Sequence, residues 1–460
     1  MNKTLYSELM AVLGSLNSEW RNSWDSFSTD PSLVMDEATA TSALAALEER
    51  LKNNYPFFHP RYAGQMIKPA HPIAMAAYMM AMQINPNNHA LDGGPATAKM
   101  ELEVVADIAA MFGFREHLGH LTSSGTIANL EALWVARSLH PQKAIAYSTF
   151  SHYTHRRMCG VLNTLSIEIP SLPDGTIDCD ALETELKKGT VGTVVVNLGS
   201  TSVGAVDTVH DVLPLCRKYG ARVHVDGAYG GFFTLLARSS NPIIDPRPFL
   251  AIAECDSIVV DPHKHGLQPY GCGCVIFRDP SVGSFYKHDS PYTYFTSKEL
   301  HLGEISLECS RAGASAASLW CTLRCLPLAS DSGLGEVLAK TRRAALRWSH
   351  LIAESAVLTE YLPPQLDIVT YYPSTDPVST SRVEKRSRSI FEHLMNRPER
   401  PIYLALLSVD TPRFAALHPG LLCDKDTSVV LRSVLMKPEH EAFVPEMFGE
   451  IEELVRDGFL

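Results

Sequence analysis

The chain has 460 residues, 45% of them hydrophobic and 20% charged, which predicts a folded protein of two or three structural units. Its net charge is −11 and its basic residues are scattered singly, which excludes the basic surface of a nucleic-acid-binding protein. It contains no signal-peptide pattern and no run of about 18 apolar residues, so we expect a cytoplasmic protein without a membrane partner.

The first 60 residues are predicted to form a helical arm. Leucines recur at helical spacing from Leu5 to Leu16, and residues 39–54 repeat the pattern. The next segment, residues 54–72, is rich in proline and aromatic residues and cannot continue a helix. We expect an irregular connector there, a kind of segment that often lines a site.

Residues 61–335 are predicted to form a large α/β domain. From Pro95 onward, apolar strand patterns alternate with amphipathic helical patterns, which is typical of a largely parallel sheet. The expected helices cover residues 97–113, 126–139, 152–162 and 207–220, the expected strands cover 143–148, 164–170, 192–200, 221–226, 257–264 and 272–279, and residues 120–125 are expected to form a turn.

The last part of the chain, residues 336–460, is predicted to be a smaller α+β domain. A long amphipathic helical pattern covers residues 336–356. Candidate strands follow at residues 367–373, 402–409 and 428–436.

Ligands of α/β sheets bind beyond the carboxyl ends of the strands, so polar residues that follow a strand pattern are the first candidates for a site. A turn of small residues, 122–125, opens the helical pattern at 126–139. The first N–H groups of a helix lack partners within it and the helix dipole is positive there, so this turn can bind an anion such as phosphate. The alternative is an ordinary helix cap by Ser123 or Ser124.

A second candidate is Asp226, which ends an apolar strand pattern. The small residues Gly227, Ala228, Gly230 and Gly231 follow it and leave room for a flat ligand. A carboxylate there can accept a hydrogen bond from a protonated ring nitrogen, and the alternative is that Asp226 caps the next helix. No GxGxxG follows any strand pattern, which argues against a nicotinamide dinucleotide.

The strand pattern at residues 257–264 delivers Asp261, His263 and Lys264 into a turn. A lysine against apolar surroundings has a depressed pKa and becomes a usable nucleophile, as a Schiff base requires. The alternative is a surface lysine. A metal site at His263 and His265 is disfavoured because carboxylate or cysteine partners at a suitable spacing are missing, and the ten cysteines, which lack zinc-site spacing, are expected to be reduced thiols.

Two further side chains, His152 and Arg311, complete the candidate set. An imidazole can stack on an aromatic ring, and a guanidinium can bind a substrate carboxylate through two hydrogen bonds. Taken separately, each residue is better explained as a helix cap or as part of a structural ion pair.

In this order the segments resemble the fold-type I pyridoxal-phosphate (PLP) enzymes, and specifically the group II amino-acid decarboxylases, which include glutamate, aromatic amino-acid and archaeal tyrosine/aspartate decarboxylases. The similarity covers residues 92 to 315, close to half of the chain. The motifs that carry it are GGPATAKMELEVVADIAAMFG (93–113), TSSGTIANLEAL (122–133), SHYTHRRMCGV (151–161), NLGSTSVGAVD (197–207), HVDGAYGG (224–231) and DPHKHG (261–266).

The resemblance implies an α/β fold of the aspartate aminotransferase-like kind, with a mostly parallel sheet in the large domain and a small C-terminal α+β domain. It implies a PLP cofactor and a homodimer whose active site lies at the interface and is shared. Lys264 would hold PLP as a Schiff base, Asp226 would keep its pyridine nitrogen protonated and His152 would stack on the ring, which makes these three the candidate catalytic residues. The other cofactor contacts would come from Gly125, Thr126, Thr201, Ala228 and His263.

The chain also departs from the family pattern. HKHGLQPYG replaces the HKW of many members and is closer to the archaeal tyrosine/aspartate decarboxylases and the phospho-sphingoid lyases. The stretch between PYTYF and SRAG is shorter than the loop that carries a catalytic tyrosine in the aromatic amino-acid enzymes, and Tyr292 and Tyr294 are the candidate replacements.

We therefore expect a PLP-dependent L-amino-acid decarboxylase that releases carbon dioxide and an amine, with Arg311 as the candidate ligand of the substrate carboxylate. Three alternatives stay open: a PLP-dependent C–C lyase, an oxidative deaminase on the same scaffold, and a non-catalytic PLP-binding scaffold. Two sets of side chains are candidates for selecting the substrate: Arg61, Lys68, His71 and His89 for an acidic one, and Phe57, Phe58 and Tyr62 for an aromatic one.

Overall fold

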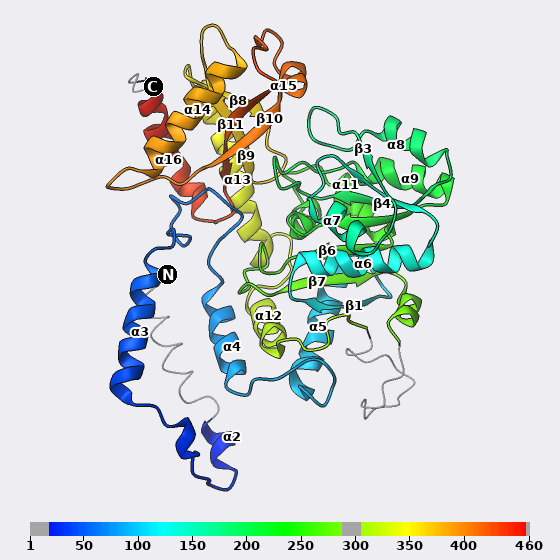
Figure 1. The fold of residues 1–460 in the computed structure, drawn as a ribbon, viewed down its shortest axis with the longest axis vertical. Coiled ribbons are helices and arrows are strands. Elements are labelled where there is room, and N and C mark those ends of the chain that lie inside the picture. The colour runs from blue at the N-terminus through cyan, green and yellow to red at the C-terminus, as the bar shows by residue number, and fades with distance from the viewer. Residues whose placement is uncertain (1–17, 288–304, 457–460) are drawn as a thin grey trace.

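The structure is a computed structural model that describes residues 18–287 and 305–456. Two separate sheets organise it, one of seven strands and one of four (Figure 1). The seven-stranded sheet has the order β1-β7-β6-β5-β4-β2-β3. Its strands are β1 (Leu118–Thr122), β2 (Ala144–Ser148), β3 (Ser166–Ile169), β4 (Val191–Asn197), β5 (Arg222–Asp226), β6 (Ser257–Val260) and β7 (Gly273–Phe277).

The large sheet is mostly parallel, as the sequence predicts. Strands β3, β2, β4, β5 and β6 pair in parallel, and only β7 runs antiparallel to its neighbours β6 and β1. Parallel strands are covered by helices on both faces and therefore consist of continuous apolar runs. All seven residues of β4 are accordingly buried.

Alternate residues of β6 point into different cores on the two faces of the sheet. Ile258 and Val260 pack in the core that includes α5 (Pro95–Phe112), whereas Val259 packs in the core that includes α6 (Gly125–Leu139). The remaining helices of this region are α7 (Thr154–Val161), α8 (Cys179–Leu186), α9 (Val209–Tyr219), the short α10 (Thr234–Ala237) and α11 (Arg247–Leu250), and α12 (Gly313–Cys325).

The turn expected at residues 120–125 is partly wrong. His120, Leu121 and Thr122 belong to strand β1, which is buried throughout and pairs with β7 from Leu118 opposite Phe277 to Thr122 opposite Gly273. The turn itself is shortened to Ser123 and Ser124. Its partner strand lies more than 150 residues along the chain, so local pattern did not reveal the pairing.

The four-stranded sheet forms the C-terminal part and is antiparallel, in the order β10-β11-β9-β8. Helix α13 (Gly333–Glu354) packs against it through Trp348, which is fully buried and contacts Tyr371. The division of the chain at residues 60 and 335 stays a proposal. The other elements are β8 (Leu358–Leu362), β9 (Ile368–Pro373), α14 (Thr380–Met395), β10 (Ala405–Asp410), α15 (Thr411–Leu417), β11 (Thr427–Val434) and α16 (His440–Arg456).

The described part of the N-terminal arm stands away from the body of the protein (Figure 1). It contains α2 (Ser18–Asn22) and α3 (Glu37–Leu51), and neither helix has a buried residue. The leucines from Leu5 to Leu16 lie outside the described residues. After the connector, α4 (Pro72–Met82) packs against α12.

Among the described helices, none combines the length and the apolar composition that crossing a membrane requires. The cytoplasmic location expected from the sequence stays a prediction.

Candidate active site

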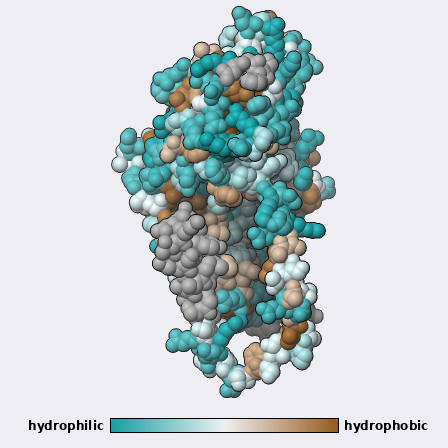
Figure 2. Space-filling model, turned by 90° about the vertical axis from the view of Figure 1, so that its left-hand side faces the viewer, coloured by the Kyte–Doolittle hydropathy of each residue, from teal (hydrophilic) through white to brown (hydrophobic). Residues whose placement is uncertain are grey.

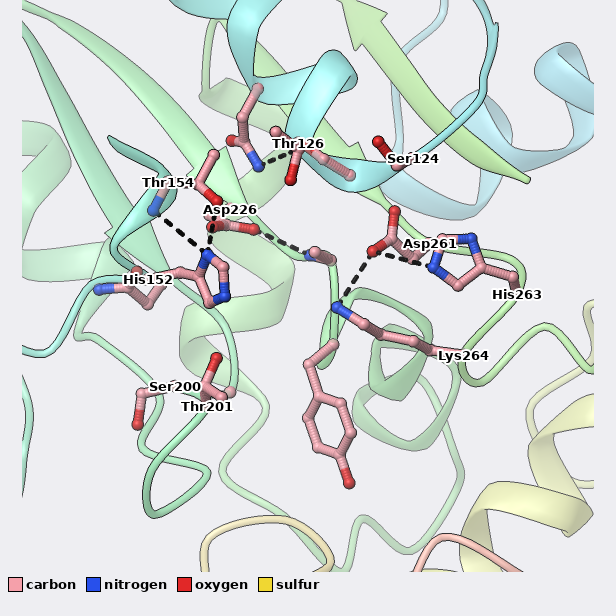
Figure 3. Close-up of a pocket in the computed structure, with 16 residues that line it drawn as sticks. Ser124, Thr126, His152, Thr154, Ser200, Thr201, Asp226, Asp261, His263 and Lys264 are labelled. Carbon is pink, nitrogen blue, oxygen red and sulfur yellow. Dashed lines mark hydrogen bonds and ion pairs between the residues drawn. The ribbon is translucent and has the colours of Figure 1, made fainter. Parts of the chain in front are cut away.

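A cavity of about 230 Å³ lies beyond the carboxyl ends of β4, β5 and β6, next to the N-terminus of α6 (Figure 3). This is where α/β sheets bind ligands, because the loops that leave neighbouring strands diverge there. Its lining residues are Ser124, Gly125, Thr126, Asn129, His152, Thr154, Asn197, Gly199, Ser200, Thr201, Asp226, Ala228, Tyr229, Asp261, His263 and Lys264.

All eight residues expected to bind the cofactor line this one cavity, although they come from five segments spread over 140 positions. Figure 3 shows Lys264, His152 and Asp226 converging on the same space. Arg311, the candidate ligand of the substrate carboxylate, is not among the lining residues. Folding therefore gathers the expected cofactor contacts in one place and leaves the expected carboxylate ligand elsewhere.

The N-terminus of α6 presents unpaired backbone donors to the cavity. Ser124 is the N-cap, and its Oγ accepts a hydrogen bond of 3.4 Å from the backbone N–H of Ile127. Ser124 therefore caps the helix, as one reading of the sequence predicts, and the same turn can still bind an anion, as the other predicts. A methyl group on residue 125 would come within 2.5 Å of Asp261 Oδ2, so only glycine fits against this carboxylate. The N–H groups of Gly125 and Thr126 have no intrahelical partner and are free to bind an anion.

Asp226 is held ionised at the end of β5. Its Oδ1 accepts a hydrogen bond from the Ala228 N–H at 3.1 Å, and its Oδ2 lies 2.8 Å from His155 Nε2. Burial alone raises the pKa of this carboxyl, but the hydrogen bond and charge of His155, the charge of Lys264 and the Ala228 N–H outweigh it and lower the pKa below its ordinary value. A negative charge therefore persists at this end of the cavity.

The expectation of a depressed pKa for Lys264 is wrong for this structure. Burial lowers the pKa, as expected, but the carboxylate of Asp261 lies 3.0 Å from the Lys264 amine and, with a smaller contribution from Asp226, raises the pKa above its ordinary value. Asp261 itself is 2% exposed, and its Oδ1 has no hydrogen-bond partner among the described residues. The strand pattern predicted that Lys264 lies at the site, but it could not show that the Asp261 side chain points toward the Lys264 amine.

The two histidines of the cavity have different surroundings. His152 Nδ1 accepts from the backbone N–H of Thr154 at 3.3 Å and lies 2.6 Å from the Thr154 hydroxyl. Burial, together with the charge of Lys264, lowers the pKa of His152 despite the opposing charge of Asp226. His263 Nδ1 lies 2.7 Å from the Cys272 carbonyl, to which it donates, and burial likewise lowers the pKa of its ring. Both rings are thus neutral near pH 7.

Arg311 makes structural contacts and does not line the cavity. Its guanidinium is buried, pairs with the buried carboxylate of Glu101, and donates to the carbonyls of Leu121 at 2.8 Å and Asn88 at 2.9 Å. These contacts join α5, β1 and the loop before α5 to the start of α12. The alternative of a structural ion pair, weighed from the sequence, is the one that the structure supports.

Several lining residues were missed by sequence reasoning. Asn197 ends β4 and donates to Ser148 Oγ, Ser151 Oγ and Asp207 Oδ2, and Tyr229 donates to Asp367 of the C-terminal part at 2.6 Å. Both follow an apolar strand pattern, so their position after a strand was a signal that could have been used. The candidate loop tyrosines, Tyr292 and Tyr294, lie outside the described residues.

The residues considered for substrate selection do not line the cavity either. Arg61 pairs with Glu446 and Glu450, and Lys68 donates to the Met436 carbonyl at 3.2 Å. Tyr62 packs among other aromatic rings of the connector and Tyr403. The remaining members of the two sets, Phe57, Phe58, His71 and His89, are also absent from the lining.

Curated proteins of similar sequence include amino-acid decarboxylases. The L-tyrosine decarboxylase of Enterococcus faecium is 28% identical over 391 residues, which cover 64% of this chain and 64% of that protein. The probable L-tyrosine/L-aspartate decarboxylase of Methanothermobacter thermautotrophicus is 28% identical over 321 residues, which cover 69% of this chain and 84% of that protein. The chain thus spans just under two thirds of the first relative and most of the second.

The fold is shared with solved structures. The structure of Oryza sativa TDC with PLP and tryptamine superposes with a TM-score of 0.76 at 19% identity, covering 96% of this chain and 92% of that chain. At this identity the likeness concerns the fold alone, and it confirms the expected fold-type I architecture. A family model, the pyridoxal-dependent decarboxylase conserved domain, matches residues 34–355, well over half of the chain. The resemblance carried by the six motifs is thereby confirmed: the chain belongs to the pyridoxal-dependent decarboxylase family.

Proposed function

We propose that this protein decarboxylates an L-amino acid, with PLP bound covalently to Lys264. The observation that carries the proposal is the convergence of the Lys264 amine, the ionised Asp226 carboxylate and the N-terminus of α6 on one cavity. An amine, a carboxylate and an anion cradle are the three complements of an aldehyde, a protonated ring nitrogen and a phosphate, and PLP has all three on one ring.

The residues present fit that cofactor. Gly125 and Thr126 would bind the phosphate at the helix N-terminus, where a side chain on residue 125 would collide with Asp261 and shift the backbone donors. Ala228 leaves room beside Asp226 for a flat ring, and Thr201 lies on the opposite wall. When bound, PLP supplies an electron sink whose ring nitrogen must stay protonated, and Asp226 provides the negative charge that keeps it so.

The protein's own groups then hold and move protons. Because the Thr154 N–H donates to His152 Nδ1, the proton of the neutral ring lies on Nε2, which points into the cavity (Figure 3). We assign to this Nε2–H the return of a proton to the substrate carbon after carbon dioxide leaves, with Nδ1 taking up a replacement proton through the Thr154 hydroxyl 2.6 Å away, so that the ring stays neutral. Asp261 holds the Lys264 amine in the cavity through the 3.0 Å ion pair until the cofactor binds.

The substrate is proposed to be an aromatic or an acidic L-amino acid, the two classes in the names of the relatives. The test is to incubate the PLP-loaded protein with a panel of L-amino acids while carbon dioxide, amine, ammonia and aldehyde are measured in parallel. Carbon dioxide and amine in equal amounts support the proposal and identify the substrate. Aldehyde or ammonia without carbon dioxide would instead indicate a C–C lyase or an oxidative deaminase.

We also propose that the protein is a homodimer in which the N-terminal arm packs on the partner chain. The described helices of the arm have no buried residue, and an isolated helix of this length is marginal in water. Figure 2, which views the molecule from the side of the arm, shows apolar side chains on its surface. Those exposed by more than half are Trp20, Trp24, Phe27, Leu33, Val34, Met35, Leu44, Leu47 and Leu51.

The oligomeric state tests the dimer. Light scattering during size-exclusion chromatography should give twice the chain mass for the full protein and the mass of one chain after removal of residues 1–54. A shared site further predicts that mixing two differently inactivated variants restores part of the activity. A full-length monomer that retains all its activity would contradict both the dimer and the shared site.

A further inference from the structure

His155, which lies on α7, contacts the carboxylate expected to face the cofactor. Its ring is fully buried, and its Nε2 lies 2.8 Å from Asp226 Oδ2. The other carboxylate oxygen, Oδ1, accepts from the Ala228 N–H at 3.1 Å. Both oxygens of Asp226 are therefore held by the protein, one by a side chain and one by the backbone.

The contact has a defined direction. An ionised carboxylate only accepts hydrogen bonds, so Nε2 of His155 carries the proton and donates it. The other ring nitrogen, Nδ1, is buried and has no hydrogen-bond partner among the described residues. Burying an unsatisfied ring nitrogen has a free-energy cost that an aliphatic side chain of similar volume would avoid. The contact with Asp226 is what this histidine adds over a leucine.

The location of His155 couples it to the rest of the site. Its backbone N–H donates to the carbonyl of His152 at 3.1 Å, so the turn that opens α7 carries the ring in the cavity and, three residues later, the donor behind Asp226. The ring of Tyr147 lies beside it, with centroids 6.1 Å apart, and closes this side from solvent. The buried ring therefore packs beside Tyr147 and contacts Asp226 through Nε2.

We infer that His155 is a positioning residue that fixes Asp226 in the orientation and charge state required by the protonated ring nitrogen of PLP. It acts through Asp226 and does not itself line the cavity. Its hydrogen bond is the largest of the effects that oppose burial and lower the pKa of Asp226. The inference rests on the cofactor assignment and is independent of which substrate bond the enzyme breaks.

Three substitutions of His155 separate positioning from filling space. Glutamine places an amide N–H where Nε2 lies, asparagine is too short to reach Asp226, and leucine fills the volume without a donor. The expected order of PLP affinity in equilibrium dialysis is wild type and His155→Gln above His155→Asn and His155→Leu, with a gap of about ten- to a hundredfold, the effect of one hydrogen bond to a charged group. Thermal denaturation of the four proteins without PLP shows which of them are folded.

A second readout reports directly on the ring nitrogen. Solid-state NMR of PLP labelled with ¹⁵N should show a protonated pyridine nitrogen in the wild type and in His155→Gln, and a shift toward the neutral form in His155→Asn. Equal affinities and equal ¹⁵N shifts in the glutamine and asparagine variants would overturn the inference, even if the leucine variant fails to fold. If the wild type releases no carbon dioxide while the ¹⁵N shifts of the variants follow the expected order, that result would count against the proposed reaction but not against His155.

Discussion

Replacing Arg311 with methionine should destabilise the protein without altering substrate recognition. The substitution leaves the buried carboxylate of Glu101 without its cation and the carbonyls of Leu121 and Asn88 without a donor. Breaking a buried ion pair by removing one partner costs about 3–5 kcal/mol of the free energy of unfolding. A substrate ligand would behave differently, because its loss raises KM and leaves the stability nearly unchanged.

Urea denaturation and steady-state kinetics on the same preparations distinguish the two roles. We expect Arg311→Met to lower the denaturation midpoint, and the protein that remains folded to keep KM within about twofold of the wild type. The matched control adds Glu101→Gln, whose carbonyl oxygen still accepts the Leu121 N–H that Glu101 Oε1 accepts at 2.9 Å. With the buried charge removed, the double variant should recover about 2 kcal/mol. A stable Arg311→Met with KM raised tenfold or more (~1.4 kcal/mol) would refute the reasoning.

Two other predictions follow from the cavity and its support. Gly125→Ala should weaken PLP binding, because its methyl group would meet Asp261 Oδ2 at 2.5 Å. The control Gly449→Ala in α16, where nothing lies within 4 Å, should leave PLP affinity unchanged. Equal PLP affinities of the two variants in equilibrium dialysis would show that the phosphate does not bind at the N-terminus of α6. Burial raises the pKa of Asp367 from 3.8 to about 6, so the folded state holds a proton that the unfolded state releases, and this stability is lost as the pH rises through that window. Between pH 4 and 7 the wild type should therefore lose about 2 kcal/mol relative to Asp367→Asn, and parallel pH profiles from chemical denaturation would contradict this.

The parts of the fold that were predictable are those determined by local pattern. Strands β4 and β6 contain apolar runs because both faces of a parallel sheet are buried, whereas β5 alternates valines with polar residues; the ends of all three strands locate the site. Asp226 and Lys264 were found in this way, since Asp226 is the last residue of β5 and Lys264 lies in the turn that follows β6. The motifs around them then supplied the family and the cofactor.

The parts that were missed depend on contacts between distant segments. Strand β1 is recognisable only through its pairing with β7, and the guanidinium of Arg311 finds its carboxylate 210 positions earlier in the chain. The raised pKa of Lys264 follows from the orientation of one side chain, Asp261, which no pattern encodes. His155 was overlooked because His152, three residues before it, was the one residue of this segment that was predicted to belong to the site.

The most direct test of the central claim is to identify the lysine that binds PLP. The PLP-loaded protein is reduced with sodium borohydride, which makes the link between cofactor and lysine permanent, and is then digested and analysed by mass spectrometry. The account predicts a pyridoxyl group on the peptide that contains Lys264, and no such modification in Lys264→Ala. Labelling of a different lysine, or equal labelling of the wild type and Lys264→Ala, would contradict it.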